Sequence, residues 1–194
     1  MGTRNLIAVF YDGEYRIAQY CQWDGYPEGQ GMGCLKFLRE HVDEQKFKDA
    51  LKKLRWVNEE KLSRIFQDYG GDTEGFIDCK NSDRFKKAFP EFSRDTGSDI
   101  LAMVQNGDTT TNTVQNTLHF AADSWCEWCY VIDYDKRTFE VYCGYNTTPL
   151  TPDDRFYNLR EYEDDSGYHA VKLIKTFDLD NLPTEQEFID TFKE

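Results

Sequence analysis

The sequence predicts an α/β (α+β) protein in which a mostly antiparallel sheet is covered by helices. Residues 5–11 and 128–142 are rich in aromatic and β-branched side chains, which favour strands. Between them, apolar residues recur at helical spacing, most clearly over residues 43–69. Strand-like ends and a helical middle predict helices packed against one sheet or against two stacked sheets.

The first predicted element is a strand over residues 5–11, which form an apolar run of strand length. The Asp12-Gly13 pair that follows is typical of a tight hairpin turn, so residues 15–20 should pair back antiparallel. Helices are expected next, and their limits come from capping residues: residues 33–41, a helix opened by Asp43, one opened by Asn58 and ended by Gly70, one opened by Ser82 and one opened by Ser98.

The last third of the chain is expected to be mostly sheet. The predicted strands are residues 114–120, 128–133, 138–142 and 170–177. Residues 151–167 are acidic and polar and predict a loop, whereas Thr184 and Glu187 have the spacing of a capping box that opens a terminal helix. No sharp change of composition marks a linker, so residues 1–194 are predicted to form a single domain.

The stretch over residues 19–31 carries the densest set of side chains suited to binding or catalysis. Three glycines and one proline predict an irregular loop there. Because large aromatic side chains are costly to leave in water, Trp23 and Tyr26 are expected to be buried. Asp24 is then expected to be hydrogen-bonded to Arg4, to a backbone amide or to a glutamine, since a buried carboxylate needs a partner.

Two segments of the chain resemble a family of uncharacterised proteins of bacteria, phages and fungi. The first is residues 1–31, with its Met-Gly-Thr-Arg start and the Trp23-Asp-Gly-Tyr-Pro27 run. The second comprises Cys126–Asp133 and Phe139–Tyr142. This resemblance implies no particular function.

A strand, a turn, a second strand and then Asp24 is an order similar to that of N-terminal-nucleophile hydrolases of the bile-salt-hydrolase and penicillin-acylase type. The resemblance implies layered sheets and helices, with Asp24 as a catalytic residue. Gly2 stands where that family has its Cys nucleophile. Amide hydrolysis would therefore require cleavage after Gly2, which would leave Thr3 as a nucleophile with its own amine as the base.

The hairpin brings the loop after Tyr20 close to the start of the chain, so residues 3–4 and 20–30 are predicted to form one pocket. Its arginine could orient the carboxylate, and its amides could hold a carbonyl group of a ligand. The candidate catalytic residues are Thr3 and Asp24, and the candidate ligand-binding residues are Arg4, Tyr20, Gln22, Trp23, Tyr26 and Gln30.

No metal ion or cofactor is expected. Cys126 and Cys129 have no second cysteine pair with which to complete a zinc site, and in a strand they would point to opposite faces. The three histidines are scattered, and no glycine-rich phosphate-binding motif occurs. The cysteine pair is therefore interpreted as structural.

A net charge of −13 disfavours binding to nucleic acid or to anionic membranes. The aromatic content of 15% indicates a folded chain. No apolar run reaches the length of a membrane helix and no signal-peptide pattern is found, so a cytoplasmic protein with free thiols is expected.

Three functions remain open from the sequence. The leading hypothesis is a protein that binds a small molecule, or an inactive relative of the hydrolases, with its pocket at residues 20–30. The second is an acidic interaction protein with a basic protein partner, such as a phage anti-defence protein or an inhibitor that mimics nucleic acid. The third is an active amide hydrolase that uses Thr3.

Overall fold

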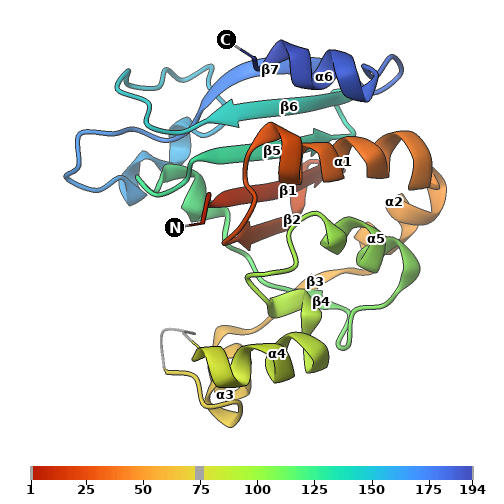
Figure 1. Ribbon diagram of the computed structural model, residues 1–194, viewed down its shortest axis with the longest axis vertical. Coiled ribbons are helices and arrows are strands. Elements are labelled where there is room, and N and C mark those ends of the chain that lie inside the picture. Colours follow the sequence, from red (N-terminus) through yellow and green to blue (C-terminus); the bar gives the residue numbers. More distant parts are fainter. Residues whose placement is uncertain (1, 73–76, 194) are drawn as a thin grey trace.

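A computed structural model describes residues 2–72 and 77–193, and its central element is a five-stranded sheet with the order β2-β1-β5-β6-β7 (Figure 1). β1 and β5 are parallel, and the other three neighbouring pairs are antiparallel, which confirms a mostly antiparallel sheet. The strands are β1 (Asn5–Tyr11), β2 (Glu14–Cys21), β5 (Trp128–Asp133), β6 (Thr138–Cys143) and β7 (Lys172–Asp178). A separate two-stranded parallel sheet pairs β3 (Arg55–Trp56) with β4 (Thr113–Val114).

Helices account for most of the middle of the chain, as expected. The α-helices are α1 (Met32–Lys36), α2 (Glu44–Lys53), α3 (Glu59–Asp68), α4 (Cys79–Ala88), α5 (Asp99–Asn106) and α6 (Glu185–Thr191). Two π-helical turns flank α1, namely η1 (Pro27–Gly31) and η2 (Phe37–His41). The described residues also contain three short 3-10 helices: η3 (Pro90–Phe92), η4 (Leu118–Ala122) and η5 (Tyr157–Tyr162).

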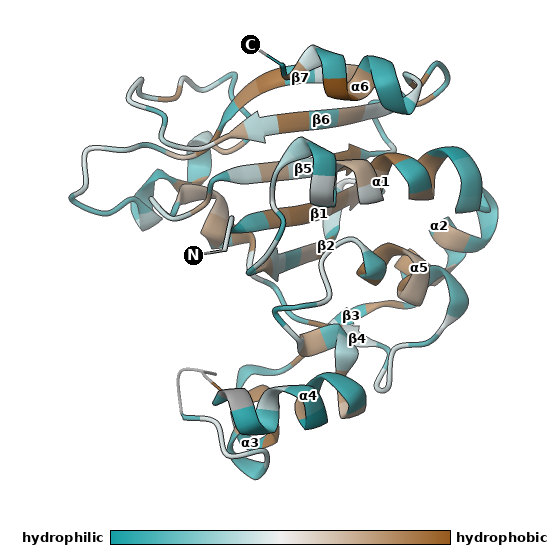
Figure 2. Ribbon diagram, viewed as in Figure 1, coloured by the Kyte–Doolittle hydropathy of each residue, from teal (hydrophilic) through white to brown (hydrophobic). Residues whose placement is uncertain are grey.

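The two faces of the sheet bury different sets of side chains, because successive residues of a strand point to opposite sides. In β1, Ile7 and Val9 belong to a core shared with α1, α2, α5 and α6, whereas Leu6 and Ala8 pack with η4 on the other face. Figure 2 shows the resulting hydrophobic colouring along the central strands. Both faces of the sheet are therefore covered.

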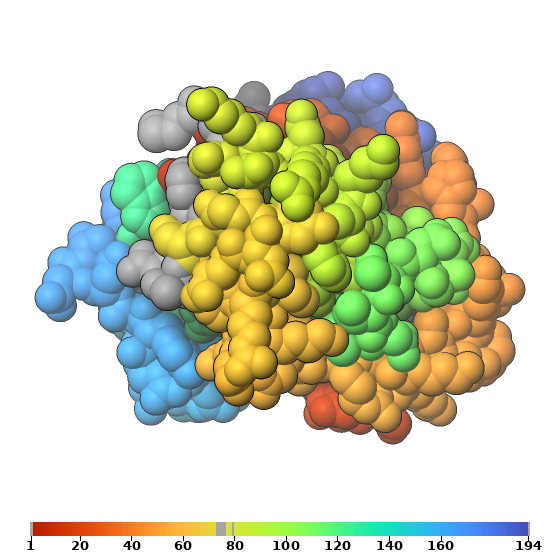
Figure 3. Space-filling model, turned by 90° about the horizontal axis from the view of Figure 1, so that it is seen from below, coloured from red at the N-terminus to blue at the C-terminus, as the bar shows by residue number. Residues whose placement is uncertain are grey.

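A third apolar cluster lies beyond the β2 edge of the sheet, where α3 and α4 form one end of the molecule (Figures 1 and 3). Its buried members are Leu62, Phe66, Ile77, Phe85 and Phe92. Phe66 and Phe85 stack with ring centroids 5.2 Å apart. This α3–α4 cluster has its own small core, which is separate from the two cores of the sheet.

The capping residues that fix helix starts are mostly confirmed. The Asp43 carboxylate accepts from the backbone N–H of Lys46 at 3.0 Å, and Asn58 accepts from that of Lys61 at 3.1 Å. Thr184 makes the predicted capping box at the start of α6. These short-range signals succeed because a cap involves residues only three positions apart.

One predicted helix start and one predicted strand are wrong. Ser82 does not open a helix, because Asp78 caps α4 instead and accepts from Asn81 N–H at 2.9 Å. Residues 114–120 do not form one strand, because the Asn116 side chain accepts from Leu118 N–H at 3.1 Å and turns the chain into η4. Two large stacked sheets do not occur among residues 2–72 and 77–193.

The expected loop over residues 19–31 is also partly helical. Pro27 occupies the start of η1, where a missing N–H costs nothing. The glycines serve close packing rather than irregularity, since a Cβ on Gly31 would lie 2.8 Å from the ring of Tyr130. Helical structure therefore begins six residues earlier than predicted, at Pro27 rather than at Gly33.

Candidate functional site

The N-terminal segment and the turn after β2 lie side by side, which agrees with the predicted hairpin geometry. The Gly25 N–H donates to the Thr3 carbonyl at 3.0 Å, and the Tyr130 hydroxyl donates to the Gly25 carbonyl at 2.7 Å. Asp24 has a left-handed backbone conformation, with φ of 54°, and its carbonyl accepts from Gln30 N–H at 2.8 Å. Backbone contacts therefore fix this turn.

The expected burial of Trp23 and Tyr26 is wrong, because their exposed fractions are 45% and 54%. The Trp23 ring packs on Gly2, and its Nε1–H donates to the Asp95 carboxylate at 2.8 Å. The indole N–H therefore has a hydrogen-bond partner at the surface. Asp24 is also exposed, and its carboxylate has no hydrogen-bond partner within residues 2–72 and 77–193. The predicted partners of this carboxylate are therefore wrong for the described residues.

Thr3 and Asp24, the two candidate catalytic residues, are neighbours through the backbone only. Thr3 is 8% exposed, whereas the Asp24 side chain faces solvent. No hydrogen bond joins their side chains in the described part of the chain. The arrangement lacks the contact by which a carboxylate would orient a nucleophile.

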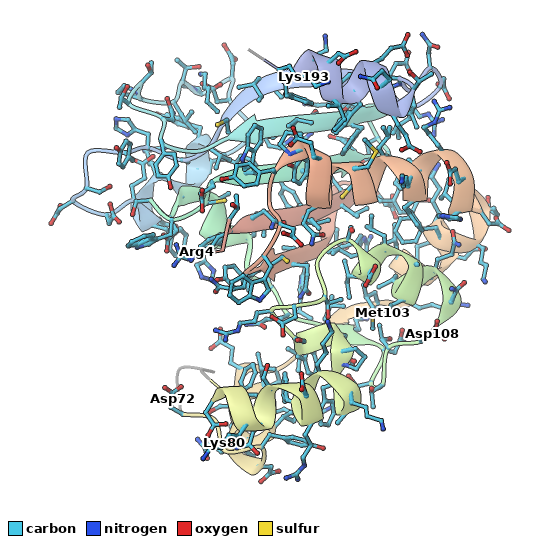
Figure 4. All side chains as sticks on the ribbon, viewed as in Figure 1. Arg4, Asp72, Lys80, Met103, Asp108 and Lys193 are labelled. Atoms are coloured by element: carbon cyan, nitrogen blue, oxygen red, sulfur yellow. The ribbon has the colours of Figure 1, made fainter. Side chains whose placement is uncertain are left out.

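Arg4 lies at the N-terminal end of β1 (Figure 4), where it contacts an aromatic ring rather than Asp24. Its guanidinium is 4.5 Å from the centre of the Trp125 ring, a cation–π contact. Its backbone N–H donates to Glu127 Oε1 at 3.1 Å. Gln30, in turn, accepts from Ser98 N–H at 2.7 Å and so connects η1 to the start of α5.

A cavity of about 310 Å³ lies between the end of β2, η4 and the α3–α4 cluster. This volume is in the range of small-molecule sites. Two of the candidate ligand-binding residues, Tyr20 and Gln22, line it, whereas the other candidates do not. Five of its fourteen lining residues are Phe or Tyr, and they come from distant parts of the chain: Tyr20, Phe66, Phe85, Phe92 and Phe120.

Gln19 is one of two polar residues of this cavity with an exposed fraction of only 4%, the other being Ser93. Its Nε2 donates to the carbonyls of Ser93 at 3.1 Å and Tyr20 at 3.3 Å. Both partners are carbonyl oxygens, which can only accept a hydrogen bond. The atom of the Gln19 amide that faces them is therefore the nitrogen. The Oε1 atom is buried and has no partner among the described residues.

The Tyr20 hydroxyl forms a polar group at the cavity wall, where it donates to Gln22 Oε1 at 2.5 Å. Burial raises the pKa of Tyr20, and the positive charges of Arg4 and Arg94 oppose that rise. Two guanidinium groups therefore act on this hydroxyl. Arg94 itself lines the cavity, and its carbonyl accepts from Gln22 N–H at 2.9 Å.

Sequence reasoning missed most of the cavity. Gln19 begins the 19–31 stretch but was not among the predicted site residues, because one amide in a strand carries no distinctive pattern. Phe66, Phe85 and Phe92 are ordinary core positions of a helical segment. The aromatic enrichment of that segment is a signal of packing, and only the three-dimensional contacts place it against β2.

The thiols of Cys126 and Cys129 do not form a second site. Both are buried, and burial raises their pKa well above the usual value, so they remain protonated and poorly nucleophilic.

Within the described residues, no group of three histidine, cysteine, aspartate or glutamate side chains is arranged to hold a metal ion. No helix in that part of the chain is long and apolar enough to cross a membrane.

Comparison of the chain with protein-family models, with curated proteins and with solved structures gives no match. The geometry of the cavity is therefore the basis for inferring a function.

Proposed function

We propose that this protein binds a small molecule in the cavity between β2 and the α3–α4 cluster. The observation that carries the proposal is a cavity of about 310 Å³ whose lining combines five Phe and Tyr residues with eight polar ones. In binding sites for small molecules, apolar surface supplies affinity and polar groups set orientation. Tyr20 and Gln22 belong to this site, so it adjoins the predicted pocket at residues 20–30.

An inactive relative of the hydrolases is compatible with this proposal. The side chain of Thr3 is buried and the carboxylate of Asp24 is in solvent, which favours binding over catalysis at that end of the molecule. The free cysteines suit a reducing compartment, and we propose a cytoplasmic location.

The acidic interaction hypothesis has less support. Several acids of the C-terminal region are already engaged within the chain: Asp154 pairs with Lys172 at 2.7 Å, and Glu163 contacts His169 at 2.9 Å. Asp180, which pairs with Arg137, comes after the last residue of β7, whereas Asp154 pairs with the first residue of that strand. Acidic groups that are paired and dispersed offer a weaker surface to a basic partner.

A cavity-filling variant tests the proposal. Ser82 lines the cavity from α4 and is only partly buried, so Ser82→Phe should fill the space without disrupting the fold. The matched control is Ser63→Phe on α3, a partly buried serine outside the lining residues. The probe is the aromatic dye 1-anilinonaphthalene-8-sulfonate, followed by fluorescence titration.

We expect the native chain and Ser63→Phe to bind the dye with similar affinity, and Ser82→Phe to bind it at least about tenfold more weakly, which corresponds to about 1.4 kcal/mol. Equal affinity in all three proteins, or no binding by the native chain, would contradict the proposal.

A further inference from the structure

Exposed aromatic side chains gather at one end of the five-stranded sheet. The residues that pair across that end are Cys21, Asn5, Trp128, Cys143 and Lys172. The exposed aromatic residues a few positions from these strand ends are Trp23, Tyr26, Trp125, Tyr145 and Tyr168. The turns at the opposite end, residues 12–13 and 134–137, are described in full and contain no exposed large hydrophobic residue. We refer to the five exposed residues as the aromatic end.

Contacts join several of these rings into one surface around Arg4 (Figure 4). The Arg4 guanidinium is 4.5 Å from the centre of the Trp125 ring, and Tyr145 and Tyr168 meet edge to face with centroids 5.5 Å apart. Burial raises the pKa of Tyr145, the charge of Glu127 raises it further, and the charge of Arg4 lowers it. Arg4 therefore lies close to both groups of rings.

Tyr145 has a backbone conformation that the packing of its ring does not explain. Its φ is 53°, a left-handed value that bulky side chains rarely adopt. The side chain is 52% exposed, so burial of the ring offsets little of the strain. Strained residues of this kind gather at ligand-binding sites. The ring is thus presented to solvent at a cost to the fold.

Charged groups beside the rings decide between kinds of partner. Arg4 lies against Trp125, and the carboxylate of Asp95 accepts from the indole N–H of Trp23. Asp24, the next residue after Trp23, is exposed. The core of a protein–protein interface is depleted of charged groups, because covering them with apolar surface is costly. A sugar avoids this cost, since its hydroxyl groups donate to carboxylates and accept from guanidinium groups.

The rings and the net charge favour a neutral sugar. One face of a pyranose ring presents C–H groups, which pack well against the negative face of an aromatic ring. The net charge of −13 repels nucleic acid, anionic membranes and anionic polysaccharides. An uncharged sugar chain is not repelled.

We propose that the aromatic end binds a neutral oligosaccharide, whose sugar rings stack on Trp125 and Tyr145 and whose hydroxyl groups hydrogen-bond to the charged groups beside them. This function is separate from the small-molecule cavity, because none of the five exposed aromatic residues lines that cavity.

Isothermal titration calorimetry of the native chain with cellohexaose, maltohexaose and chitohexaose tests the ligand class. These probes are neutral sugar chains that differ in linkage and in substituents. At least one should bind at least about tenfold more tightly than its monosaccharide, because a chain reaches two stacking rings at once. Binding of none of the three would overturn the proposal and leave a protein as the partner for this surface.

Single-residue variants locate the binding. Trp125→Ala and Tyr145→Gly should each weaken binding of the best probe by about tenfold. Tyr145→Gly should also leave the midpoint of urea unfolding unchanged or raise it, because glycine adopts a left-handed backbone conformation without strain. The matched control is Trp56→Ala, which removes an exposed tryptophan of β3, outside the aromatic end, and should bind as the native chain does.

Unchanged binding in both Trp125→Ala and Tyr145→Gly would overturn the proposal, and so would equal weakening in Trp56→Ala. Ser82→Phe, which fills the cavity, should bind the probe as the native chain does. If Ser82→Phe loses the sugar while the ring variants keep it, the sugar binds in the cavity, the proposal is wrong and the small-molecule function stands.

Discussion

Replacement of Arg155 by methionine should destabilise the fold strongly, because this side chain neutralises two buried carboxylates. Its Nε donates to Glu140 Oε2 at 2.7 Å, and its Nη2 donates to Glu140 Oε1 at 3.0 Å and to the Asp133 carboxylate. The exposed fractions of the Arg155, Asp133 and Glu140 side chains are 9%, 1% and 7%. The network connects the segment before η5 to β5 and β6.

The size of the effect follows from what Arg155→Met leaves behind. Removing one partner of a buried ion pair costs about 3–5 kcal/mol, since the remaining charges stay desolvated and unpaired. Here two carboxylates, Asp133 and Glu140, would remain, so we expect a loss near the top of that range. Replacing Glu140 by glutamine in the same variant removes one of those charges and should restore at least about 1 kcal/mol.

The effect should depend on pH. Burial alone would raise the pKa of Glu140, but hydrogen bonds from Arg155 and Tyr142 outweigh it and hold that pKa below its ordinary value of 4.5. A lowered pKa in the folded state stabilises the protein above the unfolded pKa, and this contribution is lost as the pH falls through the folded value. In Arg155→Met the hydrogen bonds from Arg155 no longer oppose burial, so the pKa of Glu140 rises and this carboxylate takes up a proton as the pH falls. The difference in the free energy of unfolding between native protein and Arg155→Met should therefore be largest near pH 7 and shrink steadily as the pH falls to about 4.

Urea unfolding followed by tryptophan fluorescence measures these free energies, with Arg160→Met as the matched control. Arg160 is exposed, stacks on Tyr157 at 4.0 Å and contacts the carbonyl of that residue, so its loss should change stability by no more than about 0.5 kcal/mol. A loss below about 1 kcal/mol for Arg155→Met at pH 7 would refute the reasoning.

Three further predictions concern the two ends of the chain. Intact mass and N-terminal sequencing should find no cleavage between Gly2 and Thr3, and a chain that begins at Thr3 would instead support the active hydrolase. Asp24→Gly should leave the free energy of unfolding unchanged or raise it by up to about 1 kcal/mol, because glycine adopts a left-handed backbone conformation without strain. If urea unfolding instead shows that the variant is less stable by more than about 1 kcal/mol, the carboxylate has a stabilising contact. Thr184→Val should cost about 1 kcal/mol through loss of the capping box at α6, and unchanged urea unfolding would show that this capping box contributes nothing to global stability.

The sequence predicted those parts of the fold that depend on near neighbours. The turn at Asp12-Gly13 and the caps Asp43 and Asn58 are confirmed, because each is decided within a few residues. The fold class is confirmed for a similar reason, since the period of apolar residues differs between helices and strands. Residues 114–120 have strand-like composition, but the Asn116 side chain accepts a hydrogen bond from the backbone of Leu118 and turns the chain. This side-chain hydrogen bond outweighs the strand propensity of the segment.

The cavity could not be predicted in the same way, because its parts meet only through tertiary contacts. Phe66 and Phe85 are separated from Gln19 by more than forty residues, and nothing in their spacing indicates that they share a site. Trp23 was expected to be buried because it is large and apolar, yet its indole N–H finds a partner in Asp95 at the surface. A side chain that is both aromatic and polar is satisfied in either place.

The end of β2 and the residues that follow it have a further role, since they hold the segment around Arg94 against the sheet. Gln19 Nε2 donates to the Ser93 carbonyl, Gln22 N–H to the Arg94 carbonyl, and Trp23 Nε1–H to the Asp95 carboxylate. Three successive residues are thus fixed by one short stretch of chain. Under the proposed function, these contacts keep Arg94 and the α3–α4 cluster at a set distance from β2, so the cavity depends on residues that look functional in the sequence but mainly position others.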